Sequence, residues 1–406
     1  MLEIRGSEGH GRRSTALPRY LLLYGAMYAA FGVASPFLPA LVGARGLSAE
    51  PLGLVLGAGT AVRLLTATLA GRTGDVLQGL RAVLAGCTAL AAAVTLGYLP
   101  AHGLWPLLAL SLAHAAALGP LTVLADALAL GAASPPPGRG RRGFEYGWVR
   151  GTGSAAFIAG TLLSGQAVRA WGLDAIVWGQ ALLLGGAALA AVRVPELRHG
   201  RPSDAVRAPA GGVRLLWRLP RFRRLVLVAA LILGSHAMHD AFAVIRWSAA
   251  GVGPAAAGAL WSSAVGAEVL VFFVIGPPLV TWLTPAGALT VAALAGVLRW
   301  AVAAQSAAPL SMALIQPLHG LTFALLHLAS MRVLARTVPP GLEGTAQALY
   351  SMVGIGGAIA VLTLLSGALY ARLGAHGFWV MAALCALAVP LTWTLRSPAC
   401  SERRTP

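Results

Sequence analysis

The sequence contains no lysine and has few charged residues of any kind, although it is 406 residues long. Charged residues make up 11% of the chain and apolar residues 57%, and the mean hydropathy is +0.75. A soluble protein of this length would need more polar surface to remain dispersed, so this composition excludes an ordinary soluble domain. Long apolar runs recur along the whole chain and predict an integral membrane protein.

Cysteine is scarce, and nucleotide-binding motifs are absent from the sequence. Cys87, Cys385 and Cys400 lie far apart without metal-ligand spacing, which argues against a disulfide framework or a metal site. No G-x-x-x-x-G-K-[ST] loop occurs, so no nucleotide cofactor is expected. The net charge of +17 would suggest a nucleic-acid partner in a soluble protein. Here the arginines cluster in loops between apolar runs, so no nucleic acid is expected.

Apolar windows of about 20 residues predict an all-α membrane protein with twelve membrane-spanning helices. The first six spans are expected at 20–42, 51–71, 81–99, 105–130, 147–169 and 174–193. The second six are expected at 224–245, 257–281, 286–304, 309–334, 344–371 and 376–395. The first run is longer than the apolar core of a signal peptide, so we expect it to be retained as the first helix.

The distribution of arginine predicts the orientation of these spans. The N-terminus, the even-numbered loops with their adjoining span ends, and the C-terminus hold 24 of the thirty arginines. The odd-numbered loops hold only four, which are Arg45, Arg169, Arg246 and Arg372. Arginine-rich loops remain in the cytoplasm, so both termini are predicted to be cytoplasmic, in a multi-pass protein of the bacterial inner membrane.

The longest polar stretch divides the spans into two sets of six. It is interpreted as a cytoplasmic linker over residues 194–223, and with the flanking Arg193 and Arg224 it carries nine arginines. The linker separates a six-helix N-terminal bundle (1–193) from a six-helix C-terminal bundle (224–406). Such a division is typical of transporters built from internal repeats.

Internal similarity supports a duplication. The string "TLLSG" occurs at 161–165 and again at 363–367, an offset of 202 residues. "GLSAEPLG" (46–53) aligns with "GVGPAAAG" (251–258) at an offset of 205. Two matches at nearly the same offset, in equivalent spans, favour two pseudo-symmetric bundles.

Small residues recur every fourth position on the fifth span. They are Gly147, Gly151, Ala155 and Ala159. Such a stripe lets two helix backbones approach closely, either so that they can rock against each other or as static packing.

Ionisable side chains inside a membrane are costly and usually face a cavity or a partner. Asp126 ends the fourth span and Arg150 begins the fifth, so an ion pair between adjacent helices is expected. The alternative is that both extend to the membrane interface. Arg63 lies in mid-span, opposite Glu268 in the repeat alignment. It is a candidate anchor for a substrate carboxylate, which guanidinium can bind through two parallel hydrogen bonds, or a structural partner of Glu268.

Glu268 lies near the centre of an apolar stretch, 260–280, where a carboxylate costs free energy unless it is protonated or paired. Arg299 on the ninth span is within reach of it, and His319 is central in the tenth. A group held between apolar surroundings and a cation can change its protonation state when that partner moves away. Glu268 is therefore the leading candidate for the proton carrier. His319 and Asp240 follow it, and Arg299 completes the proton-coupling group.

The segment "HAMHD" (236–240) places two histidines and an acid on one helical face. His236, His239 and Asp240 have the i, i+3, i+4 spacing that metal ligands can show. The segment lacks the glutamate base of H-E-x-x-H, so a metal site is not expected. We assign His236 and His239 to substrate binding instead.

Several stretches make the sequence resemble the major facilitator superfamily, and within it the phenylpropionate transporter branch related to lactose permease and the nucleoside–proton symporters. In the first half these are "LADALAL" (124–130) and "EYGWVRGTGSAAFIAG" (145–160). In the second half they are "SHAMHDAFAVIRWSAAG" (235–251), "GALWSSAVGAEVLVF" (258–272), "VLRW" (297–300), "LHGLTFALLHLASMR" (318–332), "QALYSMVGIGGAIAVLTLLSGALY" (347–370) and "GFWVMA" (377–382).

The resemblance implies a twelve-helix fold, alternating access and proton-coupled uptake of a small organic molecule. In the lactose permease pattern, an acid ending the fourth helix and an arginine on the fifth bind sugar, and they correspond to Asp126 and Arg150. The acid of the eighth helix, the arginine of the ninth and the histidine of the tenth correspond to Glu268, Arg299 and His319.

The sequence departs from the family pattern at two places. Thr322 stands where the permease has its proton-carrying glutamate, so the proton carrier differs here. The loop motif G-x-x-x-D-R-x-G-R survives only as Gly71 and Asp75.

We expect a proton-coupled symporter that imports a small organic solute, with an aromatic carboxylate as a candidate, and that acts as a monomer without cofactor or metal. One alternative is an exporter of drugs or metabolites in the same fold. Another, from a different class, is an intramembrane enzyme or a non-transporting sensor.

Overall fold

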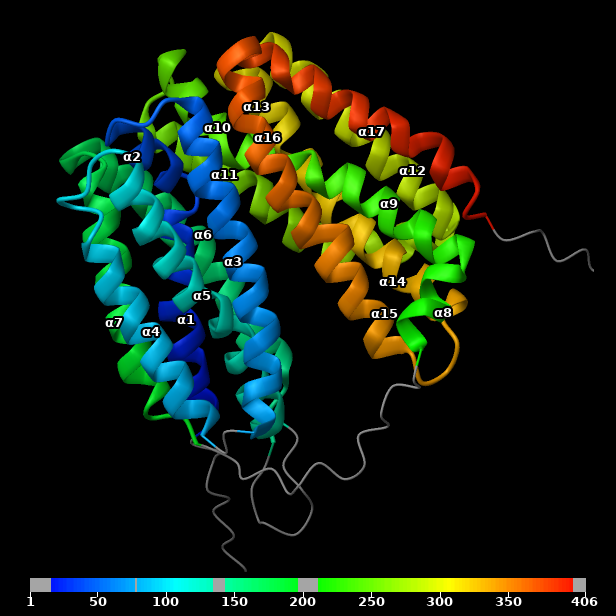
Figure 1. The fold of residues 1–406 in the computed structure, drawn as a ribbon, viewed down its shortest axis with the longest axis horizontal. Coiled ribbons are helices and arrows are strands. Elements are labelled where there is room, and N and C mark those ends of the chain that lie inside the picture. The colour runs from blue at the N-terminus through cyan, green and yellow to red at the C-terminus, as the bar shows by residue number, and fades with distance from the viewer. Residues whose placement is uncertain (1–15, 77–78, 134–142, 196–210, 397–406) are drawn as a thin grey trace, which may run out of the picture.

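The computed structural model describes residues 16–76, 79–133, 143–195 and 211–396. Helices account for most of these residues (Figure 1). The helices before residue 196 are α1 (Ala16–Ala34), α2 (Leu38–Ala44), α3 (Ala49–Val76), α4 (Leu80–Leu96), α5 (Leu104–Ala133), α6 (Tyr146–Trp171) and α7 (Asp174–Ala191). Those after residue 210 are α8 (Gly212–Arg218), α9 (Pro220–Gly234), α10 (His236–Ala249), α11 (Pro254–Leu270), α12 (Gly276–Gln305), α13 (Pro309–Ile315), α14 (Leu326–Thr337), α15 (Glu343–Leu349), α16 (Ala358–Leu373) and α17 (Phe378–Trp393).

Twelve membrane spans can be traced through these described helices. Seven stretches are long and apolar enough to cross a membrane, and the pair α1–α2, bent by 45°, raises the number to eight. Two of these stretches are 52 and 51 residues long, enough for two crossings each. They break at Thr284 and at the turn Gly374–Gly377. Helices α4 and α6 complete the twelve, so the predicted all-α twelve-helix fold is confirmed.

The predicted span boundaries agree with the structure to within a few residues. The largest shift is at the second span, which runs to Val76 rather than to residue 71. Pro254, Pro285 and Pro309 each begin a span, because proline fits the first turn of a helix, where its missing N–H is not needed.

Helices α1–α7 and α8–α17 form two groups that approach each other at the end marked by α2 and α10 (Figure 1). They spread apart toward the opposite end, where α8 and α15 lie. Helix α1 packs against α6 and α7 in one group, and α12 packs against α17 in the other. Of the linker expected at 194–223, residues 196–210 lie outside the described residues. The part that is described contains α8 and the start of α9.

The two groups cross through glycines that belong to the repeated strings. A Cβ on Gly53 would lie 2.6 Å from Gly367 Cα, and a Cβ on Gly165 would lie 2.8 Å from Pro254 O and 3.4 Å from Gly258 Cα. Gly53 and Gly258 end one repeated string, and Gly165 and Gly367 end the other. Each string in one half therefore packs against the copy of the other string in the opposite half. The α3–α16 and α6–α11 crossings repeat the same contact, as pseudo-symmetric bundles should.

The stripe of small residues predicted for close approach on the fifth span is in the wrong register. Nothing lies within 4 Å of a Cβ built on Gly151. Further along α6, a Cβ on Gly160 would lie 2.4 Å from Ala29 O of α1. The i+4 spacing alone did not identify the face that α6 turns toward α1, because glycine and alanine occur on several faces of this helix.

Candidate functional site

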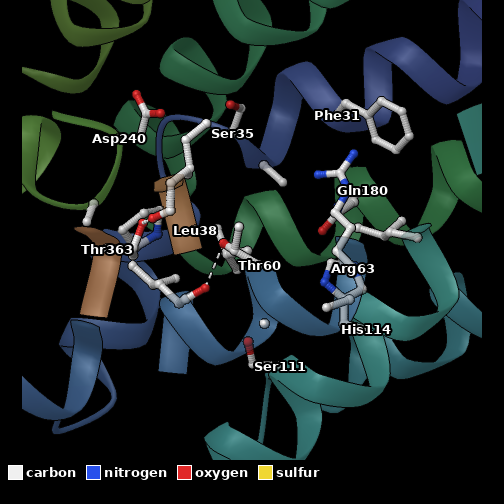
Figure 2. Close-up of a pocket in the computed structure, with 18 of the residues that line it drawn as sticks. Phe31, Ser35, Leu38, Thr60, Arg63, Ser111, His114, Gln180, Asp240 and Thr363 are labelled. Atoms are coloured by element: carbon white, nitrogen blue, oxygen red, sulfur yellow. Dashed lines mark hydrogen bonds between the residues drawn. The ribbon is translucent and has the colours of Figure 1, made fainter. Parts of the chain in front are cut away.

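A cavity of about 430 Å³ lies between the two groups of helices. Its walls come mainly from α1, α3, α5, α6 and α7, with α10 and α16 supplying the other side. Most of the lining is apolar, and polar side chains are spaced around it (Figure 2). The polar groups at the cavity are Tyr28, Ser35, Thr60, Arg63, Tyr98, Ser111, His114, Thr122, Gln180, Asp240 and Thr363.

Arg63 reaches the cavity from the middle of α3. Its guanidinium carbon lies 5.7 Å from the centre of the Phe31 ring, and Figure 2 shows it beside Gln180 and His114. Within the described part of the chain, no carboxylate lies within 4.0 Å of this guanidinium. Arg63 is exposed to the cavity, so this permanent positive charge without an anionic partner is available to an anionic ligand. The predicted partnership of Arg63 with Glu268 is not formed here.

Asp240 lies at the other end of the cavity from Arg63 (Figure 2). Its Oδ1 is 3.1 Å from His239 Nδ1, and its side chain is half-exposed. The cavity therefore presents a cation near one end and an acid near the other, so the electrostatic potential differs between its two ends.

Asp126 and Arg150 form a separate polar group with three tyrosines. Arg150 Nη1 lies 3.8 Å from Asp126 Oδ1, as expected for an ion pair between adjacent helices. The Tyr24 hydroxyl donates to Asp126, and Arg150 donates to the Tyr28 hydroxyl. Tyr146 donates to Asp126 Oδ1 at 2.8 Å.

Sequence reasoning missed these tyrosines. Tyr24 and Tyr28 stand at i and i+4 on one face of α1, a spacing that could have identified them, and their rings stack 5.7 Å apart. Tyr28 also lines the cavity, so it joins this group to the cavity wall.

Glu268, His319 and Arg299 form a chain of polar contacts in the second group of helices. Arg299 Nη1 lies 3.1 Å from His319 Nδ1, and His319 Nε2 lies 3.4 Å from Glu268 Oε2. Arginine has no acceptor, so His319 Nδ1 must accept and the ring proton must be on Nε2, facing the carboxylate. Histidine thus stands between the acid and the guanidinium, which sequence spacing had placed next to each other.

Arg299 is fully buried. Its Nη2 donates to Gln316 Oε1 at 3.1 Å, and its guanidinium carbon lies 4.5 Å from the centre of the Trp300 ring. Gln316 was missed from the sequence, because glutamine in an apolar span gives no charge signal. These contacts hold the guanidinium in one place against His319.

Irregular backbone accompanies this chain of contacts. A π-helical turn, Val271–Ile275, begins three residues after Glu268, and a second, Gly320–Leu325, begins directly after His319. Such turns re-aim side chains within a helix and are frequent at functional sites.

His236 and His239, which we predicted to bind substrate, are buried, and neither lines the cavity. His239 stacks on Trp261 with ring centroids 5.1 Å apart, and the His236 ring lies 5.1 Å from that of His319. Both face the interior of their own helix group, where Trp261 and Trp300 enclose them. Among the described residues, no group of three or more His, Cys, Asp or Glu side chains could hold a metal ion.

Twelve spans in two pseudo-symmetric bundles around a central cavity define a membrane transporter of the major facilitator type. The chain belongs to the MFS_1 like family, which residues 17–381 match. It is 34% identical over 375 residues to the "Probable 3-phenylpropionic acid transporter" of Escherichia coli (strain K12), covering 90% of this chain and 94% of that protein.

Solved transporters share the fold at low sequence identity. The nucleoside transporter NupG superposes with a TM-score of 0.79 at 14% identity, over 94% of this chain and 98% of that one. A bacterial homologue of the human lysosomal transporter Spinster, in an inward-facing and unoccupied conformation, superposes with a TM-score of 0.70 at 14% identity, over 97% and 100%. These relatives are transporters and not enzymes.

Proposed function

We propose that this transporter is a proton-coupled symporter that imports a small organic anion of the aromatic carboxylate class. The carrying observation is Arg63, a cation without an anionic partner in a cavity whose wall includes Phe31 and Phe157. Guanidinium binds carboxylate in a planar, bidentate geometry, and aromatic rings pack against apolar and aromatic ligands. The relative named for 3-phenylpropionic acid supports this class, because that molecule joins a phenyl ring to a carboxyl group.

The arginine distribution supports an orientation for the molecule. With the arginine-rich loops inside, the α8 end is cytoplasmic and the α2 end faces outward. The glycine crossings close the outward end, so the structure corresponds to an inward-facing state. Residues 1–193 and 224–406 would rock about the cavity as two bodies joined by the linker 194–223. The Escherichia coli relative favours the bacterial inner membrane.

Glu268 is the proposed proton carrier. Its carboxylate Oε2 lies 3.4 Å from Nε2 of His319, whose ring Arg299 contacts through Nδ1. Protonation removes the negative charge that attracts His319. The contact between Glu268 on α11 and His319 on the tenth span is then weaker. Thr322 is buried and donates to His319 O at 3.2 Å, so it has no acid role. Moving one charge across 100 mV supplies about 2.3 kcal/mol for accumulation.

Uptake by purified protein in proteoliposomes tests this function. With an alkaline interior, we expect 3-phenylpropionate to accumulate above its external concentration, and a protonophore should abolish the accumulation. Solute that accumulates only when the interior is acidic would instead identify an exporter. Binding of a neutral sugar or nucleoside in preference to the acid would refute the assignment of Arg63.

A further inference from the structure

A second pocket, of about 400 Å³, lies at the α8 end of the second helix group, away from the transport cavity. Three arginines from three different segments converge on it: Arg221 at the start of α9, Arg336 near the end of α14, and Arg396 after α17. The rest of the lining is Leu283, Thr284, Pro285, Ala286, Gly287, Val333, Thr337 and Leu395. None of these side chains is acidic.

The three charges have no acidic partner among the described residues. Over the described ranges, none of the three arginines has a carboxylate within 4.0 Å, in contrast to Arg45, which pairs with Asp174 at 2.6 Å. Like charges gathered in one pocket repel each other, so a bound anion would stabilise the pocket.

The backbone at this pocket also favours an anion. The chain breaks at Thr284 (φ 63°, ψ 158°), and a helix restarts at Pro285. The first turn of a helix leaves N–H groups without partners inside the helix, and they carry partial positive charge. The Gly287 N–H donates to Thr284 Oγ1 at 3.4 Å and caps this helix start, and both residues line the pocket beside the arginines.

The exposed aromatic residues nearby indicate the depth of the pocket in the membrane. Trp282 is 79% exposed and directly precedes the Leu283–Gly287 wall, and Trp393 is 54% exposed three residues before Arg396. Tryptophan concentrates at the boundary between lipid tails and headgroups. The arginine distribution places this end on the cytoplasmic side, where anionic lipids attract basic residues.

We propose that this pocket, defined by Arg221, Arg336 and Arg396, binds the phosphate headgroup of an anionic phospholipid. Guanidinium groups bind phosphate oxygens in pairs, and the partial positive charge at the start of the restarting helix lies on the same side. The lipid tails would lie along the apolar surface beside Trp282. The pocket joins the eighth span, which carries Glu268, to the ninth, which carries Arg299, so the bound lipid would brace the connection between them.

Lipid binding by the full-length chain, purified and delipidated in mild detergent, tests the proposal by native mass spectrometry. The pocket variant is Arg221→Gln with Arg336→Gln, and the matched control is Arg224→Gln with Arg332→Gln. Both remove two charges from α9 and α14, but Arg224 and Arg332 lie outside the pocket. We expect phosphatidylglycerol to bind the wild type and the control with similar affinity. Its affinity for the pocket variant should be lower by roughly tenfold or more. Phosphatidylcholine should bind all three weakly.

Three results would overturn the proposal. Equal losses in the pocket variant and the control would show that only the diffuse positive charge matters. Equal binding of phosphatidylcholine would show no headgroup selection. If millimolar inorganic phosphate displaced the lipid from the wild type, and the wild type bound phosphate in the absence of lipid, a soluble anion would be the occupant. Arg396→Gln, which alters an exposed residue near the end of the described chain, repeats the test if the double variant does not fold.

Discussion

Two arginines near the middle of the membrane, Arg63 and Arg299, have opposite surroundings. Arg299 is fully buried and is held by Gln316, His319 and Trp300. Arg63 faces the cavity, where the Phe31 ring lies against its guanidinium and no carboxylate of the described residues pairs with it. A buried guanidinium held by side-chain contacts can orient its neighbours, whereas one that faces open space is available to a ligand. We therefore propose that the same residue type serves proton coupling in one bundle and substrate binding in the other.

Replacing Arg63 should affect substrate affinity more than protein stability. Arg63→Lys keeps the charge but loses bidentate geometry, so we expect the KM for 3-phenylpropionate to rise several-fold. Arg63→Gln loses a charged hydrogen bond of about 1.5–3 kcal/mol, which corresponds to a rise of roughly 10- to 100-fold. Initial uptake rates in proteoliposomes measure both, with Arg169→Gln, an exposed arginine at the end of α6, as the control. Unchanged KM in both Arg63 variants would exclude it as the anchor.

Replacing Glu268 should separate exchange from accumulation. Glu268→Gln mimics the protonated acid and cannot release a proton, so the variant should bind substrate and exchange it across the membrane at near wild-type rates. It should fail to concentrate substrate under a proton gradient. Counterflow and gradient-driven uptake measure the two activities. The control is Glu343→Gln, because Glu343 is exposed and its carboxylate accepts a loop hydrogen bond from Gly341 N. Normal accumulation by Glu268→Gln would move the proton site to His319 or Asp240.

At the scale of helices, hydropathy predicted the number and limits of the spans because a bilayer requires about 20 apolar residues for each crossing. It could not predict how each helix is rotated about its axis. His236 and His239 were therefore predicted to bind substrate, but in the structure they lie against Trp261 and Trp300. The π-helical turns after Glu268 and His319 were also not predictable, because they insert one residue without changing composition.

The crossing of α3 and α16 should control closure of the α2 end. A Cβ at Gly367 would lie 2.8 Å from Ala49 O and 3.0 Å from Gly53 Cα, so Gly367→Leu must push the two helices apart. Gly185→Leu is the matched control, because nothing lies within 4 Å of a Cβ at that helical position. A single cysteine at Thr60, which lines the cavity, reports access when the three native cysteines are replaced by serine. We expect Gly367→Leu alone to increase alkylation of this cysteine from the α2 end, and equal labelling in both variants would show that the crossing is not a seal.

At the scale of the molecule, the two proposed tasks are divided between the bundles. The cavity takes most of its wall from α1–α7, whereas the Glu268–His319–Arg299 chain lies wholly within the second group. Asp240 connects them, because it faces the cavity from α10 while contacting His239, next to the buried aromatic rings around His319. Substrate in the cavity and a proton on Glu268 can thus influence each other through one helix.

Access to the cavity should depend on the side of the membrane from which a reagent arrives. The glycine crossings bring the two helix groups together at the α2 end, and the proposed orientation has that end outside. In the absence of substrate, an impermeant maleimide should therefore label the Thr60→Cys reporter in inside-out vesicles several-fold faster than in right-side-out vesicles. 3-Phenylpropionate should slow the labelling, because it occupies the same cavity, and Arg63→Gln should remove this protection. Faster labelling in right-side-out vesicles would reverse the proposed orientation, and protection that persists in Arg63→Gln would place the carboxylate elsewhere in the cavity.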